Sequence, residues 1–308
     1  MALKEPLMVK YVEVTNATSV SLLTPKIGEG YKVKSLQLTA DVSDSPGNPA
    51  FCKIKIDMTT IGYYRVGSTE GNHLRWERRS SAVGSLFTYL VKEGIFPPIP
   101  LQQGETLILE FSSAYTGGIL VEYEIYDAGD VNNTAPLGSK SNELYYVLYG
   151  TNKEAITAPG YFELTGVRNP VEFPQAPFGD KVLPNQTLEI IACLAQDVGN
   201  LQGTNSTAIT TGLRFILNNK ELFNDLGSGF LLKGTAPSSA GYNYGAGISY
   251  FNPHKYGDVN PVKLFPARLT LQPFDELKVL IGVTTANNGS FPVNTIDVPL
   301  VVHLKRGG

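Results

Sequence analysis

The chain is predicted to be an all-β protein of two tandem jelly-roll domains, that is, Greek-key β-sandwiches with a few short helices in their loops. Three observations support this. Apolar residues alternate with polar ones along many short segments, turn-forming residues separate those segments, and the two halves of the chain repeat the same series of segments. The length of 308 residues is that of about two average domains.

The alternating segments carry the β-branched and aromatic residues that are typical of half-buried strands. They lie at residues 31–40, 52–56, 107–111 and 121–125, and turn-forming stretches lie at 44–49, 115–118, 127–130 and 287–290. Two other stretches, 85–94 and 218–227, could each form a helix of about two turns that ends at a glycine. No strand–helix–strand series recurs, which disfavours a doubly wound parallel sheet.

Segments of the first half match segments of the second half in the same order. Residues 95–109 match 264–279 through a shared Phe-Pro pair followed by an apolar strand, and 31–40, 54–56 and 121–125 match 186–195, 215–217 and 300–304. Alternation alone also makes strands look alike, but the Phe-Pro pair at a matching distance is harder to obtain by chance. We therefore predict a duplicated domain, with domains at 1–138 and 139–308 and a seam in the polar stretch 127–142.

The charge balance excludes several classes of protein. The chain has 25 Lys and Arg against 28 Asp and Glu, which gives a net charge of −3 and no broad attraction to phosphate backbones. No apolar run approaches the roughly 20 residues of a membrane-spanning helix. No secretory signal is visible at the N-terminus, so folding in a reducing cytoplasm is expected, with Cys52 and Cys193 as buried thiols.

The sequence contains no pattern typical of a catalytic, cofactor-binding or metal site, and we predict that the protein is not an enzyme. His73, His254 and His303 have no spacing that would place two imidazoles on one metal ion. His73 and His254 look like loop positions. His303 alternates within a terminal strand and is predicted to be a satisfied edge or surface residue.

Two acidic pairs are candidates for carboxylate chemistry or cation binding. Asp127 and Asp130 flank an Ala-Gly pair, and we predict that they lie in a solvated turn. Asp275-Glu276 aligns with Glu105-Thr106 of the first half. A turn residue repeated in both halves is more simply structural than catalytic.

One basic cluster stands out as a candidate interface loop. Its residues are Arg75, Trp76, Arg78 and Arg79. Interleaved basic and aromatic residues of this kind can bind single-stranded nucleic acid, but tryptophan and arginine also dominate the energetic centres of protein interfaces. We favour the protein interface.

The paired segments, 95–109 with 264–279 and 31–40 with 186–195, together with the overall size, resemble the double jelly-roll major capsid proteins of the tectivirus and adenovirus hexon lineage. The chain most resembles the compact members from tailless, membrane-containing phages and archaeal viruses. The resemblance covers the whole chain and is one of architecture, without a fingerprint motif.

This resemblance implies a structural protein of the virion, made in the host cytoplasm, that forms homotrimers without a cofactor. Three copies with two jelly rolls each would form a pseudo-hexameric tile of an icosahedral capsid. The implied partners are other copies, penton or minor capsid proteins, and an internal membrane that faces Lys4 and Lys10, with no sequence-specific nucleic acid. The regions 62–97 and 226–266 would form the outer loops.

Two alternatives stay open at this point. One is a carbohydrate-binding or glycan-acting double jelly roll, for which the 16 tyrosines and the loop 242–247 are suitable, although the single tryptophan and the lack of an export signal count against it. The other is a minor capsid or spike protein instead of the main tile.

Overall fold

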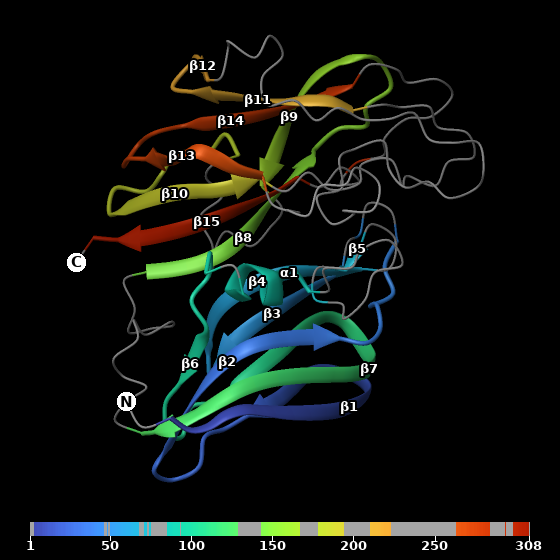
Figure 1. Ribbon diagram of the computed structural model, residues 1–308. Coiled ribbons are helices and arrows are strands. Elements are labelled where there is room, and N and C mark those ends of the chain that lie inside the picture. The colour runs from blue at the N-terminus through green and yellow to red at the C-terminus, as the bar shows by residue number, and fades with distance from the viewer. Residues whose placement is uncertain are drawn as a thin grey trace. The chain divides into compact units, whose positions relative to one another are not determined.

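The computed structural model shows two compact units (Figure 1). It describes residues 3–45, 48, 50–67, 71–72, 74, 85–92, 94–128, 143–166, 178–193, 210–222, 263–283, 293 and 298–307. The first unit comprises Met1–Asp44 and Ala50–Tyr146, and the second comprises Ser45–Pro49 and Val147–Gly308. The bounds 1–138 and 139–308 stay a prediction, because the residues around 138 lie outside the described part of the chain.

The described residues of the first unit form one curled sheet and one helix. Its strand order is β5-β4-β3-β7-β2-β6, with β1 also paired to β7. The elements are β1 (Leu3–Leu23), β2 (Glu29–Leu38), β3 (Phe51–Ile56), β4 (Thr59–Gly67), β5 (Gly71–Asn72), α1 (Leu86–Lys92), β6 (Ile99–Leu101) and β7 (Leu107–Asp127).

A long ribbon of β1 and β7 organises this unit. One half of β7 pairs with β2 and the other half with β3, while β1 follows β7 along both halves. The ribbon folds back near Asn16, whose backbone φ is 50°, and Lys10 Nζ donates a hydrogen bond of 2.6 Å across the fold to the carbonyl oxygen of Leu22. The ribbon therefore contributes to two parts of the curled sheet, β1-β7-β2-β6 and β1-β7-β3-β4.

This strand order is that of a jelly roll. When the eight strand segments of a jelly roll are lettered B to I along the chain, its two sheets read B-I-D-G and C-H-E-F. Here β1 supplies B and C, and β7 supplies H and I. The strands β2, β3, β4 and β6 supply D, E, F and G.

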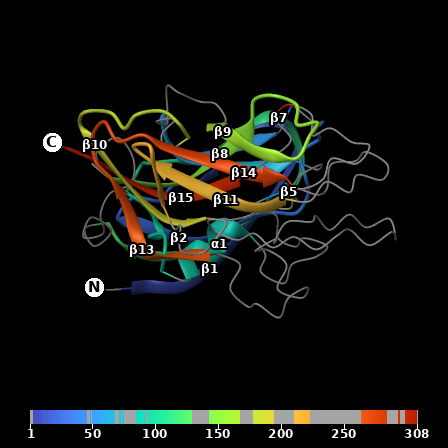
Figure 2. The same cartoon turned by 90° about the horizontal axis from the view of Figure 1, so that it is seen from above.

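The second unit has the same topology with the eight segments as separate strands. Its order is β12-β11-β14-β9-β8-β15-β10-β13, which reads F-E-H-C-B-I-D-G, and β11 runs beside β14 in both views (Figures 1 and 2). Its sheet consists of β8 (Glu143–Asn152), β9 (Gly160–Gly166), β10 (Gln186–Cys193), β11 (Thr210–Leu217), β12 (Lys220–Leu222), β13 (Lys263–Leu271), β14 (Leu277–Val283) and β15 (Val298–Arg306). The first residues of β8, up to Tyr146, cluster with the first compact unit although the strand belongs to this sheet. The predicted all-β class with two jelly rolls is confirmed.

The segments that match between the two halves of the sequence lie on equivalent strands. Residues 31–38 lie on β2 and 186–193 on β10, both of which are strand D. The other pairs fall on β3 and β11, and on the two halves of β7 with β14 and β15. The matches therefore mark equivalent strands. On strand D the match is shifted by two residues, because Tyr31 pairs with Ile125 whereas Leu188, not Gln186, pairs with Leu304.

Alternation places one face of each strand in the core of its unit. Every second residue of β3 is buried: Cys52, Ile54 and Ile56. On the opposite face of the strand, Lys55 Nζ lies 2.8 Å from Glu110 Oε2 of β7. Burial of the apolar series contributes about 1.5–3 kcal/mol for each large side chain.

The helix α1 confirms the prediction for residues 85–94 and protects an edge of β2 that β6 leaves uncovered. Thr88 Oγ1 of α1 accepts a hydrogen bond of 3.4 Å from the Leu36 amide, and the Leu74 carbonyl accepts one of 2.6 Å from the Leu38 amide. These bonds satisfy amide groups that would otherwise form an open edge. No helix among the described residues is long and apolar enough to cross a membrane.

The helix expected at 218–227 is wrong for the residues that the structure describes. Asn218 and Asn219 have φ of 48° and 66° and form the turn of a hairpin between β11 and β12. Asparagine tolerates this left-handed backbone, which two-residue hairpin turns require. Residues 223–227 lie outside the described part.

Candidate interaction surfaces

The structure does not test the predicted interface loop. All four of its residues, Arg75, Trp76, Arg78 and Arg79, lie outside the described residues. His73, His254 and Asp130 do so as well. The surfaces discussed below come from the described residues alone.

His303 is satisfied, but it is not an edge or surface residue. It lies on β15, between β8 and β10, and only 3% of it is exposed. Its Nδ1 lies 2.9 Å from Glu189 Oε2, and Lys305 Nζ donates to Glu189 Oε1 at 2.8 Å. Alternation within a terminal segment could not reveal that the last strand of the chain lies inside the sheet.

The thiol of Cys52 is buried and free, as predicted, and burial raises its pKa. A buried neutral thiol is a poor nucleophile. Cys193 lies on β10, and its side chain is outside the described part. Among the described residues, no group of three or more His, Cys, Asp or Glu is placed to hold a metal ion.

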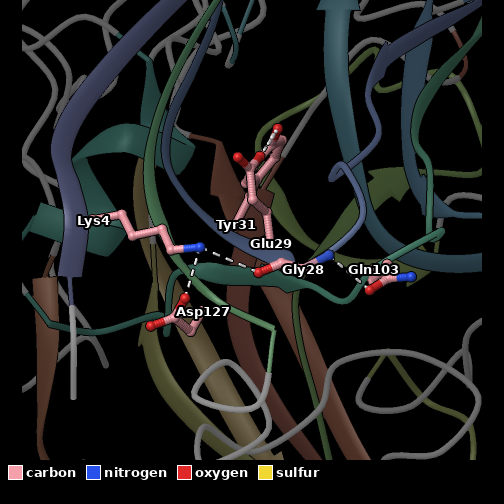
Figure 3. A network of polar contacts seen from close by, with 6 residues as sticks. All are labelled: Lys4, Gly28, Glu29, Tyr31, Gln103 and Asp127. Atoms are coloured by element: carbon pink, nitrogen blue, oxygen red, sulfur yellow. Dashed lines mark hydrogen bonds and ion pairs between the residues drawn. The ribbon is translucent and has the colours of Figure 1, made fainter.

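Asp127 joins the two ends of the first jelly roll instead of forming a site for chemistry. Figure 3 shows Lys4 Nζ 2.7 Å from Asp127 Oδ1 and 3.5 Å from the Gly28 carbonyl oxygen. The Gly28 amide in turn donates to Gln103 Oε1 at 3.0 Å. The contact ties the start of β1 to the end of β7 and to two turns.

Tyr31 lies beside this network on β2. Its hydroxyl donates to Glu29 Oε2 at 2.9 Å, and its ring lies 4.8 Å from the ring of Tyr123. Burial and the hydrogen bond to Glu29 raise the pKa of Tyr31 to about 12. The phenol therefore stays neutral and has a structural role.

The second acidic pair also proves to be structural. Asp275 Oδ2 accepts a hydrogen bond of 2.7 Å from the Gln272 amide, and in the first unit Glu105 Oε2 accepts one of 2.8 Å from the Gln102 amide. The two carboxylates close equivalent turns between strands G and H. The alignment of Glu105 with Asp275 in the sequence therefore marks the same hydrogen bond.

A second bond pattern is repeated where the E–F turn meets the G–H turn. Asp57 donates its amide to the Thr106 carbonyl and accepts from the Thr106 amide on Oδ1, both at 2.9 Å. Asn218 and Glu276 exchange the same two bonds at 2.9 and 3.0 Å. We call this reciprocal pair the turn clamp. Its position gives a structural reason why residues here are repeated in the two halves.

A stripe of exposed apolar side chains lies on β1. Leu7, Val9 and Tyr11 are 58%, 55% and 57% exposed. Among the described residues β1 pairs only with β7, so it is an edge strand. The Tyr11 ring lies across Gly118, where a Cβ atom would be 2.3 Å from it. We call these three residues the β1 stripe.

Sequence reasoning did not single out the β1 stripe. The signal was present, because residues 7–14 are apolar at both odd and even positions apart from Lys10 and Glu13. A strand with two apolar faces is expected to be covered on both. In the part of the chain that the structure describes, only one of these two faces is covered.

Exposed apolar residues also lie at the turns of both units. Ile27 and Met58 are 91% and 86% exposed in the first unit, and Leu183 and Phe274 are 52% and 63% exposed in the second. The cavity bounded by Ile54, Tyr64 and Phe96, by contrast, has a volume of about 10 Å³, enough for about one water molecule. The β1 stripe, which lies on a strand and not in a turn, is therefore a better candidate for function than the cavity.

Comparison with known proteins gives little further guidance. No family model and no curated protein match the sequence. Among solved structures, the chain is similar to the crystal structure of the STIV MCP at 10% sequence identity and a TM-score of 0.38, with 98% of this chain and 97% of that chain covered. So low a TM-score carries no assignment, and the jelly-roll fold rests on the strand order.

Proposed function

We propose that this chain is a major capsid protein, three copies of which form a pseudo-hexameric tile of an icosahedral viral shell. The observation that carries the proposal is the repetition of one jelly roll twice in a single chain, down to the turn clamp. A trimer of such a chain has six similar domains around its axis. It can therefore be surrounded by six neighbours although its true symmetry is threefold.

The surface chemistry supports this role. Only 17% of the residues are charged and the net charge is −3, so copies meet without strong mutual repulsion. Contacts in a shell can be individually weak because each subunit makes many of them at once. The exposed β1 stripe is a surface of the kind that such contacts use.

The role would place the protein in the virion, with synthesis in the host cytoplasm and no enzymatic activity. Its partners would be other capsomers, penton or minor capsid proteins and an internal membrane. Lys4 is engaged with Asp127 and Lys10 with the Leu22 carbonyl, so the proposal assigns no membrane contact to these two lysines.

Light scattering of the purified chain at micromolar concentration tests the proposal. A species of three times the 33.4 kDa chain mass is expected, and negative-stain images should show flat pseudo-hexagonal particles. A stable monomer that forms no larger species would overturn it. In purified particles the protein should also be the most abundant band, which distinguishes the main tile from a minor protein.

A further inference from the structure

The β1 stripe faces away from the core of the first jelly roll. Val9 pairs with Glu122 of β7 and Tyr11 with Leu120, whereas Lys10 between them pairs with the fully buried Val121. Paired residues on neighbouring strands point to the same side of a sheet. The stripe therefore lies on the outer face, at the edge of the sheet, with apolar side chains in solvent.

An edge strand of this kind is prone to association unless something protects it. Natural edges use charges, prolines or bulges as protection. In β1 the lysine that could serve, Lys10, lies on the opposite face of the strand, where it bonds to the Leu22 carbonyl, and a bulge and Pro6 interrupt only the first residues. From Leu7 to Tyr11 the outer face has no charged side chain.

The size of the stripe indicates what kind of partner can cover it. Three half-exposed side chains present roughly 300 Å² of apolar surface, whereas a stable one-to-one complex buries about 800 Å² on each partner. The stripe alone is too small to hold an unrelated protein. It is sufficient where several identical contacts close a ring, as copies of one chain do.

The charges beside the stripe point to the same occupant. Glu13 and Glu122 lie on this face, and neither makes an ion pair with another described residue. The covering surface should therefore offer basic and apolar side chains together. The sequence of this chain contains such a combination in Arg75, Trp76, Arg78 and Arg79.

We propose that the β1 stripe binds a second copy of this chain and forms the contact between subunits of the trimer. The inference rests on the proposed function, because it names the surface that the trimer uses. It assigns Leu7, Val9 and Tyr11 as the apolar centre of that contact and Glu13 with Glu122 as its acidic rim.

The test compares two double variants of the full chain by mass photometry over a dilution series. Val9→Thr with Tyr11→Thr removes apolar surface but keeps a β-branched residue in the strand. Ile27→Thr with Met58→Thr is the matched control, because these residues are more exposed but lie in turns. Circular dichroism and thermal melting establish that both variants fold.

The stripe variant is expected to raise the trimer dissociation constant at least tenfold, and the control to leave it unchanged. A wild-type trimer that the stripe variant does not weaken overturns the inference and leaves the proposed function standing. A monomeric wild type overturns the proposed function and the inference with it. The three results are therefore distinguishable.

Photocrosslinking adds a readout that does not depend on affinity. A benzophenone amino acid replaces Tyr11, and isotopically light and heavy chains are mixed before irradiation. Crosslinks that join light to heavy chains support the proposal. Crosslinks confined to one chain, or a trimer that gives no crosslink from this position, contradict it.

Discussion

Phe274 occupies in the second unit the turn position that Gly104 occupies in the first, and both residues have a left-handed backbone, with φ of 71° and 84°. In each turn a glutamine lies two positions before this residue, and an acidic residue follows it directly. The backbone amide of the glutamine donates a hydrogen bond to the carboxylate of that acidic residue. Glycine adopts this conformation freely, whereas a side chain with a Cβ atom is strained by about 1–2 kcal/mol. The second unit therefore keeps an exposed aromatic residue at an energetic cost.

Replacing Phe274 with glycine should make the protein more stable. Relief of the backbone strain exceeds the extra freedom that glycine gains in the unfolded chain, and the ring, 63% exposed, contributes little packing. We expect the free energy of unfolding to rise by about 0.5–1 kcal/mol. Urea unfolding followed by tyrosine fluorescence would measure the change.

The reverse substitution in the first unit is the control. Gly104→Ala should lower the free energy of unfolding by about 1 kcal/mol through backbone strain alone, because a Cβ atom at Gly104 meets no atom within 4 Å. If Phe274→Gly instead clearly lowers the free energy of unfolding, the ring must stabilise its own unit by packing against it, and the explanation from backbone strain is wrong.

The turn clamp predicts different outcomes for two substitutions of the same kind. Asp57→Asn keeps the carbonyl oxygen that accepts from the Thr106 amide, so its effect should be within about 0.5 kcal/mol. Asn218→Asp also keeps the acceptor for Glu276, but it replaces an amide that donates to Asp275 Oδ1 at 2.7 Å with a second carboxylate. Its loss should be about 1 kcal/mol at neutral pH.

Thermal unfolding of both variants and of Asp57→Ala at two pH values checks this asymmetry. The loss in Asn218→Asp should shrink in acid, where the paired carboxylates take up protons, while the loss in Asp57→Ala should remain. Equal and pH-independent losses for Asp57→Asn and Asn218→Asp would show that the hydrogen bond to Asp275 does not matter.

The sequence allowed the fold to be predicted because alternation, turn residues and duplication are local signals that agree with one another. The matched segments lie on equivalent strands, and the aligned Glu105 and Asp275 make the same bond. The helix at 85–94 was also predicted correctly. The helix expected at 218–227 failed because two asparagines in a left-handed turn outweigh a weak helical pattern.

The surface could not be predicted in the same way. Whether Val9 or Lys10 faces the core depends on the register between β1 and β7, strands that are about a hundred residues apart in sequence. The buried position of His303 depends on strand order, which places β15 between β8 and β10. Such long-range pairings leave no mark in a single strand.

Lys10 should stabilise the bend at which the ribbon of β1 and β7 folds back. Its Nζ atom reaches the Leu22 carbonyl oxygen at 2.6 Å and joins the two halves of β1. Lys10→Met keeps most of the aliphatic chain but removes the donor, so the free energy of unfolding should fall by about 1 kcal/mol. Amide hydrogen exchange should accelerate on both sides of the fold, near Lys10 and near Leu22.

Lys26→Met is the matched control, since Lys26 is an exposed lysine in the turn that follows β1. It should leave both stability and exchange unchanged. Faster exchange throughout the first unit in Lys10→Met, with no difference between the ribbon and the other strands, would mean that the bond does not act locally.

The lowered pKa of Glu189 predicts how the stability of the second unit depends on pH. Burial alone would raise its pKa, but the hydrogen bonds from Lys305 and His303 outweigh burial and hold the pKa below 4.5. A carboxyl group whose pKa is lower in the folded state stabilises that state at pH values above its unfolded pKa. This contribution should be complete above about pH 5 and should be lost as the pH falls through the folded value.

Glu189→Gln should therefore lower the free energy of unfolding at pH 7 by about 1–2 kcal/mol, because two hydrogen bonds lose their charged acceptor. As the pH falls through the lowered pKa of Glu189 in the folded protein, the variant and the wild type should converge, since the wild-type carboxyl group then becomes neutral as well. Glu5→Gln, at an exposed residue of β1, is the control and should change neither value. Urea unfolding from pH 3 to pH 7 measures both effects, and a gap between Glu189→Gln and the wild type that stays constant over this range would show that protonation of Glu189 does not contribute to acid unfolding.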